Sequence, residues 1–241
     1  MNREGKRASG CAGEIGDAFA PEGEVTDKLL LHLIDQRNRR HAYALRKRAF
    51  DLAVSATALV ALLPVFLLIA LIIWIDDPCG GTFFYQTRCG KKGRLFRMIK
   101  FRTMVVDAEE KLTLLRSRNE ADGPVFKLRD DPRVTRVGRF LRKTSLDELP
   151  QLLNVIKGDL SIVGPRPALP EEVARYRSHQ RRRLYIEQGI TCYWQIAPRR
   201  NEMPFDDWLA LDMAYIRDRC FRVDFRIILD TFWVMFKAEG I

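Results

Sequence analysis

One long apolar segment constrains the fold of this chain more than any other feature. Between Leu52 and Ile75 the sequence has no charged side chain, and Asp76 and Asp77 follow it directly. As a straight helix rising ~1.5 Å per residue, such a segment is long enough to cross a hydrocarbon layer ~30 Å thick. The segment therefore predicts either a spanning helix or another structure embedded in a membrane.

Two features favour a re-entrant segment over a spanning helix. Pro64 lies near the middle, where proline removes a backbone donor and interrupts a helix. Basic residues flank both ends, and the positive-inside tendency places such residues on the cytoplasmic side. They are Arg46, Lys47 and Arg48 before the segment, and Lys91, Lys92, Arg94, Arg97, Lys100 and Arg102 after it. We therefore expect residues 50–75 to form two helices broken at Pro64 that enter one leaflet and return; a proline-kinked spanning helix is the alternative.

The charge of the whole chain indicates an anionic partner. The sequence has 41 Lys and Arg against 31 Asp and Glu, a net charge of +10. Nucleic acid, phosphorylated small molecules and acidic membrane lipid all suit such a chain. We expect no nucleic acid, because the sequence shows no RNP-like, zinc or basic-zipper pattern. The basic run Arg37–Arg48 beside the apolar segment favours anionic lipid, and five scattered cysteines indicate reduced thiols.

The remaining patterns predict an α+β fold that is mostly helical. A Gly-bounded turn at Cys89–Gly93 between apolar runs predicts a small β-hairpin. Residues Asp107–Glu120 are typical of an exposed helix, and Phe205–Arg219 has the apolar spacing of a core helix. The final apolar helix, Val223–Lys237, suits either core packing or an amphipathic position in a membrane interface.

The stretch RKTSLDELPQLLNVIKGD contains two adjacent carboxylates before a helical apolar pattern. Ser145 and Glu148 fit the S-x-x-E capping box, and taken alone the pattern favours this structural role over catalysis. With Ser145 as the cap, Pro150 would lie beyond the first turn, where proline is disfavoured, whereas with Asp147 as the cap it would lie within the first turn. The sequence leaves both starts open. In both cases Asp147 and Glu148 lie at a helix N-terminus, where free amides and the helix dipole favour phosphate. The predicted apolar face of this helix consists of Leu149, Leu152, Leu153 and Ile156.

Two carboxylates at a phosphate site make chemical sense together with a divalent cation. Mg²⁺ is often bound by one or two carboxylates and by diphosphate oxygens at the same time. A carboxylate can also attack phosphorus and form an acyl phosphate, which divides one displacement into two. Asp147 and Glu148 are therefore candidates for both metal binding and nucleophilic attack.

Three basic residues are candidates to complete an anion site. Arg166 lies in the rigid sequence GPRP, and a guanidinium binds phosphate with a bidentate fork. A structural salt bridge is an equal alternative for Arg166. Arg142 and Lys143, just ahead of the carboxylates, are ambiguous in the same way.

Four blocks of the sequence together resemble the bacterial sugar transferases, which are monotopic polyprenyl-phosphate phosphoglycosyl transferases. The blocks are KRAFDLAVSATALVALLPVFLLIALIIW, IKFRTMVVDAEEKL, DGPVFKLRDDPRVTRVGRFLRKTSLDELPQLLNVIKGDLSIVGPRP and LDMAYIRDR. The resemblance begins near Arg46, so we expect residues 46–241 to be the catalytic domain and residues 1–45 a mobile basic tail. The bundle of membrane helices of larger members is not expected. The resemblance also favours a catalytic role for the carboxylate pair over the capping-box role of Ser145 and Glu148.

The resemblance implies an enzyme on the cytoplasmic face of the bacterial inner membrane. Its reaction transfers a sugar phosphate from a UDP-sugar to undecaprenyl phosphate and releases UMP. This is the first membrane step in the assembly of exopolysaccharide, capsule, O-antigen or glycoprotein glycans. In that family the Asp of the pair attacks the sugar-bearing phosphorus, and polyprenyl phosphate then attacks the covalent intermediate. Mg²⁺ is the implied cofactor, and a homodimer is one possible assembly.

The resemblance also assigns roles to individual residues. Asp147 is the nucleophile, and Glu148 assists with the metal or with a proton. Pro64 marks the membrane helix break, where the family has Ser-Pro and this chain has Leu63-Pro64. The basic residues expected to bind substrate or phosphate are Arg142, Arg166, Arg199, and Lys100 and Arg102 toward the membrane side.

Toward its C-terminus the sequence departs from the family pattern. The usual basic residue and proline before GIT are Glu187 and Gln188 here, and Pro198 stands where the family has Gly. Proline fixes a backbone angle that glycine leaves free. These departures motivate an alternative function, a catalytically silent membrane-anchored scaffold with the same fold.

Overall fold

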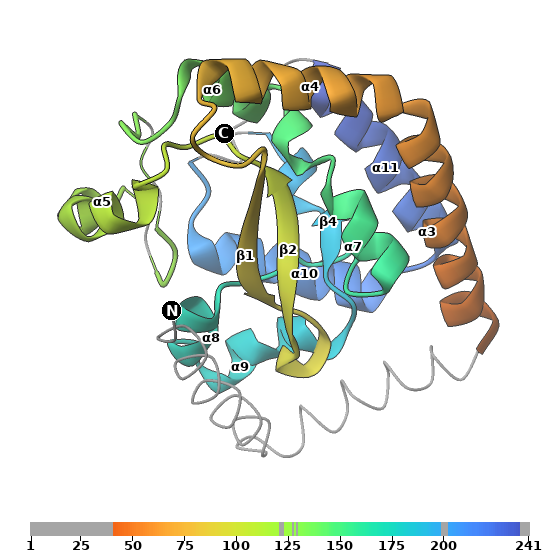
Figure 1. Ribbon diagram of the computed structural model, residues 1–241. Coiled ribbons are helices and arrows are strands. Elements are labelled where there is room, and N and C mark those ends of the chain that lie inside the picture. The colour runs from red at the N-terminus through yellow and green to blue at the C-terminus, as the bar shows by residue number, and fades with distance from the viewer. Residues whose placement is uncertain (1–40, 121–122, 127, 129, 199–201, 237–241) are drawn as a thin grey trace.

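The computed structural model describes residues 41–120, 123–126, 128, 130–198 and 202–236. Most of these residues are helical, with two small two-stranded sheets, which confirms the predicted α+β class (Figure 1). The first sheet pairs β1 (Phe83–Cys89) with β2 (Leu95–Phe101), and the second pairs β3 (Ser161–Val163) with β4 (Gly189–Thr191). The helices after the first sheet are α5 (Ala108–Leu115), α6 (Arg136–Lys143), α7 (Gln151–Lys157), α8 (Pro170–Ala174), α9 (Ser178–Arg181), α10 (Phe205–Asp218) and α11 (Phe221–Phe236).

Helices α3 (His41–Ala61) and α4 (Leu63–Asp76) form the predicted helix-break-helix. The two helices meet at a bend of 61°, with Pro64 in the first turn of α4, where a missing N–H costs no helical hydrogen bond. No single helix in the described ranges is long and apolar enough to cross a membrane, whereas the bent pair is by length and composition. The break at Pro64 is thus confirmed, and re-entry into a membrane stays a prediction. The described part of α3 already begins at His41, within the segment predicted as a tail; residues 1–40 lie outside the described residues.

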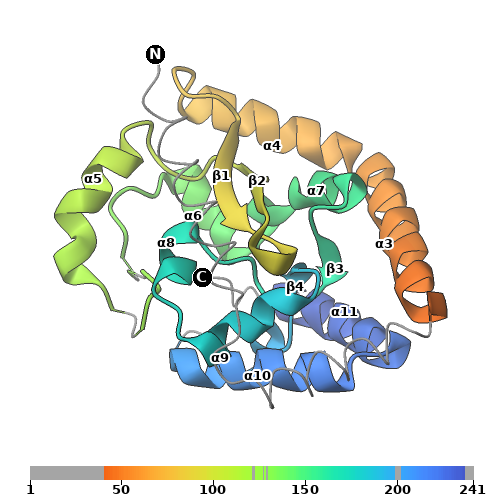
Figure 2. The same cartoon turned by 90° about the horizontal axis from the view of Figure 1, so that it is seen from below.

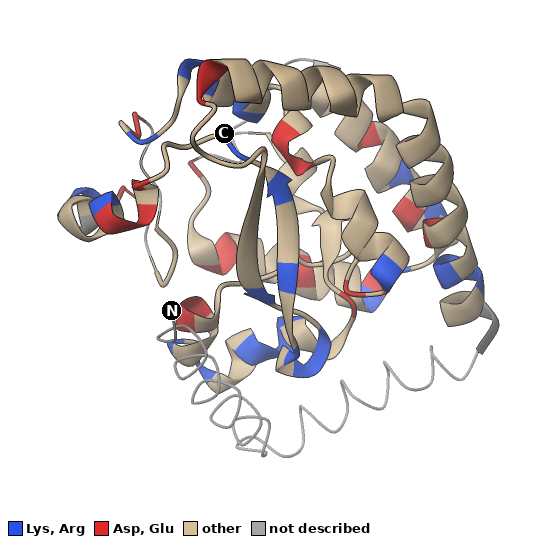
Figure 3. Ribbon diagram, in the orientation of Figure 1, with Lys and Arg blue, Asp and Glu red and all other residues tan. Residues whose placement is uncertain are grey.

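Helix α4 is apolar on both of its faces but packs with only one of them. Ile69 and Ile73 are buried against Phe101 of β2 and Leu141 of α6. The opposite face is solvent-exposed, and α4 carries no charge before its last residue, Asp76 (Figure 3). Its exposed side chains are Leu63, Leu67, Leu68, Leu71, Ile72, Trp74 and Ile75. Figures 1 and 2 both show α4 and α3 along the outer edge of the molecule.

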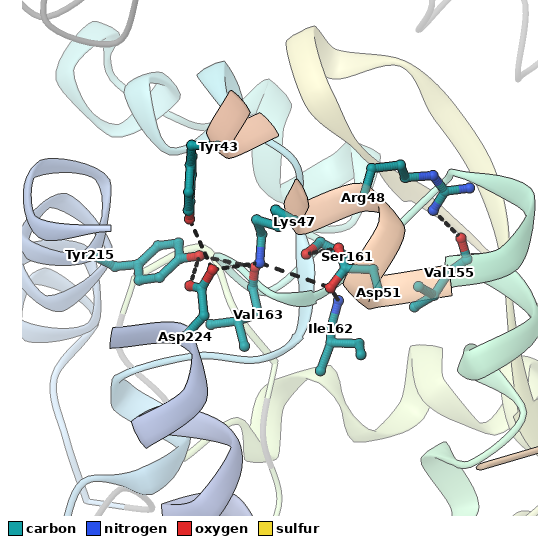
Figure 4. Close-up of polar contacts among 10 residues, drawn as sticks. All are labelled: Tyr43, Lys47, Arg48, Asp51, Val155, Ser161, Ile162, Val163, Tyr215 and Asp224. Atoms are coloured by element: carbon teal, nitrogen blue, oxygen red, sulfur yellow. Dashed lines mark hydrogen bonds and ion pairs between the residues drawn. The ribbon is translucent and has the colours of Figure 1, made fainter. Parts of the chain in front are cut away.

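The N-terminal half of α3 is fastened to the body through Asp224 of α11, which is buried (Figure 4). Tyr43 donates a hydrogen bond to Asp224 Oδ2 at 2.9 Å, and the Lys47 ammonium lies 3.0 Å from the same oxygen. Tyr215 of α10 donates to Asp224 Oδ1 at 2.7 Å. One carboxylate therefore joins three helices, and its neighbours offset the cost of burying its charge.

Two further contacts fix the direction of α3. Asp51 is buried and accepts a hydrogen bond from Ser161 Oγ at 2.7 Å (Figure 4). The Arg48 guanidinium donates to the carbonyl oxygens of Val155 and Ile156, at 2.6 and 2.9 Å, near the C-terminal end of α7. A cation at that end also complements the helix dipole. The apolar helix pair thus leaves the body at a defined angle.

The predicted hairpin is present: β1 and β2 are antiparallel, from Phe83 opposite Phe101 to Cys89 opposite Leu95. The predicted core helix is also confirmed, because α10 buries its apolar positions and stacks Trp208 on Trp194 at 4.5 Å between ring centroids. Helix α5 is exposed as expected and lies at the end of the molecule away from α3 (Figure 2).

Helix α11 packs in the core with one side and exposes apolar side chains on the other, and its position in a membrane interface stays a prediction. Ile227 and Asp224 are buried against the body. The other side forms an exposed apolar stripe of Phe221, Phe225, Leu229, Phe232 and Trp233. Such a stripe on a helix that is otherwise well packed is typical of an interaction surface.

Candidate active site

The chain between α6 and α7 differs from the predicted capped helix. Ser145 has a left-handed backbone (φ 58°, ψ 16°), and its side chain caps no helix. Residues Leu146–Glu148 form a short 3₁₀ turn, η3, and α7 begins at Gln151 directly after Pro150. The prediction that Ser145 or Asp147 starts the helix was wrong, because Pro150 is accommodated just before the first turn of α7 rather than inside it. The carboxylate pair therefore projects from a tight turn.

The predicted apolar face of α7 is also wrong in part. Leu153 and Ile156 are each 38% exposed, whereas Asn154 and Val155 are fully buried. The reason is the sheet: Asn154 accepts a hydrogen bond from the backbone N–H of Ile99 at 3.0 Å and donates to the carbonyl oxygen of Arg97 at 2.8 Å. The Asn154 side chain thus satisfies the backbone of β2, and this pairing turns the other face of α7 outward.

The turn η3 places both carboxylates next to Lys100 of β2. Glu148 Oε1 lies 2.6 Å from the Lys100 ammonium, and Asp147 Oδ2 lies 3.8 Å from it. Asp147 is 7% exposed, and Glu148 is more accessible. The structure therefore brings together three of the site residues predicted from the sequence, from positions 48 residues apart in the chain.

The two carboxylates differ in acidity. Burial raises the pKa of Asp147 to about 6, against the opposing charges of Lys100 and Arg142 and together with the charge of Glu148. Burial also works against ionisation of Glu148, but the charge and hydrogen bond of Lys100, with Arg166 and Arg88, hold its pKa below the usual range. Paired acids whose environments separate their pKa values are a recurring feature of catalytic sites.

Arg142 and Arg166 lie within electrostatic reach of the carboxylates. Helix α6, capped by Thr135, carries Arg142 in its last turn, and Arg142 Nε donates to Thr103 Oγ1 at 2.9 Å. Arg166 follows β3, and its charge lowers the pKa of Glu148. Among the described residues, the Arg166 guanidinium has no hydrogen-bond partner, so its donors remain available to an anion.

The structure places two of the predicted residues, Arg102 and Pro64, at other positions. The Arg102 guanidinium binds Asp77 and the carbonyl oxygens of Gly80 and Gly81, in the loop that follows α4. It thus secures the exit of the helix pair and does not face the carboxylates. Pro64 lies at the helix break, in the first turn of α4, and Arg199 lies outside the described residues.

One residue of the site had no assignment from the sequence. Arg88 is 5% exposed at the end of β1, where it donates to Gln86 and to the carbonyl oxygen of Pro167, at 3.1 Å. Burial and the nearby charge of Arg166 lower the pKa of Arg88 to about 9, and its own charge lowers that of Glu148. A basic residue within an apolar strand was the available signal, because a buried Arg requires partners. Arg88 brings another positive charge near Glu148.

The carboxylate pair is the predicted place for a divalent cation. The described residues contain no group of three or more His, Cys, Asp or Glu side chains able to hold a metal on their own. Mg²⁺, however, commonly uses one or two carboxylates and completes its shell with substrate phosphates and water. Asp147 and Glu148 fit this mode of binding, in which the metal arrives with a diphosphate.

Taken together, the turn η3 presents a desolvated carboxylate among cationic side chains. Lys100, Arg142, Arg166 and Arg88 supply positive charge from four different parts of the chain. An anion with several phosphate oxygens would neutralise these charges and approach Asp147. The geometry suits nucleophilic attack by a carboxylate on phosphorus.

Comparison with known proteins shows the family of the chain. A family model described as bacterial sugar transferase matches residues 42–238. Galactosyl transferase CpsE of Streptococcus agalactiae is 42% identical over 203 residues, covering 83% of this chain and 44% of that protein. Exopolysaccharide production protein ExoY of Sinorhizobium fredii is 41% identical over 199 residues, covering 80% of this chain and 87% of ExoY. Undecaprenyl-phosphate galactose phosphotransferase of Salmonella typhimurium is 39% identical over 201 residues, covering 80% of this chain and 41% of that protein.

The chain thus spans less than half the length of two of these relatives and most of the third. The family match covers the whole carboxylate turn and the basic residues around it that the structure describes. The chain therefore belongs to the bacterial sugar transferase family.

Proposed function

We propose that the protein transfers a sugar phosphate from a UDP-sugar to undecaprenyl phosphate, through a covalent intermediate on Asp147. The observation that carries this proposal is the desolvated Asp147 carboxylate beside Lys100 and Arg142. The names of relatives support the substrates: UDP-galactose-lipid carrier transferase of Erwinia amylovora, and undecaprenyl-phosphate galactose and glucose phosphotransferases. The product would start an extracellular glycan.

The two displacements balance without an external reagent. An Asp147 carboxylate oxygen attacks the sugar-bearing phosphorus, a new P–O bond forms, and the bond to the bridging oxygen breaks as UMP leaves with the electron pair. An oxygen of undecaprenyl phosphate then attacks the same phosphorus and frees the Asp147 carboxylate. Arg166 and Arg142 would hold the diphosphate, and Lys100 keeps Glu148 ionised. Mg²⁺ bound by Asp147 or Glu148 would neutralise charge on the phosphates.

We further propose that the helix pair α3–α4 enters one leaflet from the cytoplasmic side and returns. The exposed apolar face of α4 and the exposed stripe of α11 would both lie in the bilayer or its interface. The basic residues on both sides of the pair favour anionic lipid on one face. The 61° bend shortens the depth that the pair reaches compared with a straight helix.

The reaction is tested with the purified full chain in lipid nanodiscs, undecaprenyl phosphate and a panel of UDP-sugars that begins with UDP-galactose and UDP-glucose. We expect UMP release with at least one donor, loss of release in EDTA, and recovery when Mg²⁺ is added back. The absence of UMP with every donor would contradict the proposal and favour the silent scaffold. If EDTA does not affect UMP release, the proposed role of Mg²⁺ is wrong.

The raised pKa of Asp147 predicts a specific pH profile for the free enzyme. Only the carboxylate form attacks, so kcat/KM for the UDP-sugar should be constant above about pH 7 and fall about tenfold per pH unit below about 6. An ordinary aspartate would keep its activity down to about pH 4. The measurement is initial UMP release between pH 5 and 8, with circular dichroism to show that the fold persists. A flat profile across this range would contradict the assignment of Asp147.

The proposed topology predicts that both ends of the helix pair lie on the same side of the membrane. A single cysteine at Arg46, and separately the natural exposed Cys79, each in a chain whose other cysteines are replaced by serine, should both react with an impermeant maleimide from the cytoplasmic side only. A cysteine in α5 serves as the cytoplasmic reference. Labelling of the two positions from opposite sides would show that the pair spans the membrane.

A further inference from the structure

A narrow groove opens beside Glu148. It has a volume of about 110 Å³ and is formed by three separate parts of the chain. The turn η3 and α7 form one wall, β4 and the following short turn η5 (Trp194–Ile196) form the second, and the end of α11 forms the third. Its lining residues are Ser145, Glu148, Leu149, Leu152, Ile190, Thr191, Gln195, Thr231, Val234 and Met235.

The chemistry of the groove walls suits the prenyl chain of the acceptor better than the UDP-sugar donor. Half of the lining is aliphatic or Met, and the two threonine hydroxyls bind each other at 2.6 Å. Thr231 Oγ1 also donates to the carbonyl oxygen of Ile227 at 2.7 Å, and Gln195 Oε1 accepts from Cys192 Sγ at 3.2 Å. Polar groups that already have partners offer little to a sugar or a nucleotide, whereas aliphatic walls favour hydrocarbon.

The size and continuity of the groove indicate a chain that enters from a bilayer. An apolar cavity of ~150 Å³ holds benzene, so about 110 Å³ accommodates roughly one isoprene unit. Beside the groove, α7 exposes Leu153 and Ile156, each one turn along the chain from the lining residues Leu149 and Leu152. A hydrocarbon chain can therefore pass along the apolar side chains of α7 toward Glu148.

We propose that this groove receives the first isoprene unit of the lipid acceptor and thereby aligns the acceptor phosphate with Asp147. The inference rests on the proposed function and deepens it. The C-terminal helix α11 then determines acceptor recognition, although its residues lie about 80 positions beyond the carboxylate pair. The donor does not use the groove, so the two substrates approach Asp147 from different directions.

The test fills the groove and measures the two substrates separately. Val234→Trp adds bulk to the α11 wall, and Leu114→Trp places the same side chain on the exposed helix α5, outside the groove. We expect Val234→Trp to raise KM for undecaprenyl phosphate at least about tenfold and to leave KM for the UDP-sugar unchanged. Leu114→Trp should change neither constant. The all-cis isomer of farnesyl phosphate shares the cis geometry of the first isoprene units with the long acceptor, so its KM should rise by the same factor.

A second measurement does not depend on turnover or on the stability of a variant. A prenyl phosphate with a diazirine on its first isoprene unit should crosslink to α7 or α11 in the otherwise unchanged protein, and excess farnesyl phosphate should prevent this. Crosslinks elsewhere in an enzyme that releases UMP would overturn the groove and leave the proposed function intact. Equal effects of Val234→Trp on both substrates would also overturn it. Failure of the unchanged protein to release UMP is a different result, which removes the proposed reaction.

Discussion

Replacing Asp147 by asparagine is expected to lower the rate of UMP release by at least about 10³-fold. The amide cannot attack phosphorus as the carboxylate does, so neither the covalent intermediate nor the product should form. The measurement is UMP release over hours, with intact-protein mass spectrometry of the unchanged protein and the variant after mixing with UDP-sugar alone. Only the unchanged protein should gain the mass of a sugar phosphate. Near-normal UMP release by the variant would contradict nucleophilic attack by Asp147.

The stability of the Asp147→Asn variant shows whether a loss of activity is caused by misfolding. The pKa of Asp147 is raised in the folded protein, so the native state binds more protons than the unfolded chain between about pH 4 and 6. Ionised Asp147 therefore costs stability above about pH 6, and this cost disappears as the pH falls through the folded pKa toward the unfolded one. Asp147→Asn should melt at the same temperature as the unchanged protein at pH 7.5, or higher. A lower melting temperature would show that the carboxylate is structural.

Breaking the buried pair of Arg183 and Asp212 is expected to have the largest effect on stability. Arg183 and Asp212 are 4% and 1% exposed at their side chains, with 2.7 Å between guanidinium and carboxylate. Asp212→Ala would leave the Arg183 charge buried without its partner, at a cost of about 3–5 kcal/mol. The measurement is thermal or denaturant unfolding in detergent, with circular dichroism as the readout.

A surface pair on the same helix gives the matched control. Arg217 and Asp218 lie 2.8 Å apart with side chains 71% and 43% exposed, so Asp218→Ala should change stability by at most about 1 kcal/mol. Replacing both buried partners, Arg183→Met with Asp212→Leu, should recover much of the lost stability, because no unpaired charge remains. If Asp212→Ala proves no more costly than Asp218→Ala, the buried pair does not hold this part of the core together.

The sequence predicts those elements of the fold that local chemistry determines. Pro64 interrupts an apolar run, the glycines at 90 and 93 bound a turn, and α10 repeats its apolar residues at helical spacing. Each of these signals acts within a few residues, and each feature is present in the structure.

The errors arise where a distant partner competes with a local one. Glu148 fits a capping box with Ser145, but a lysine 48 residues upstream binds it instead. The apolar face predicted for α7 fails because Asn154 pairs with a strand edge, and no periodicity rule includes such a bond. Arg102 and Arg88 illustrate the same difficulty, since a basic residue in a motif gives no indication of whether it faces a loop or an anion.

The pairing of Asn154 with β2 has a further consequence for catalysis. Successive residues of a strand point to opposite sides, so a slip of one position in β2 would replace Lys100 beside Glu148 by Ile99 or Phe101. A two-stranded ribbon with a free edge is prone to such shifts. Asn154 bonds to the backbone on both sides of Met98 and thereby fixes the alignment of β2. This alignment keeps Lys100, rather than an apolar residue, beside Glu148 of η3. The buried side-chain amide of Asn154 thus positions a charged residue of the candidate active site without being part of that site.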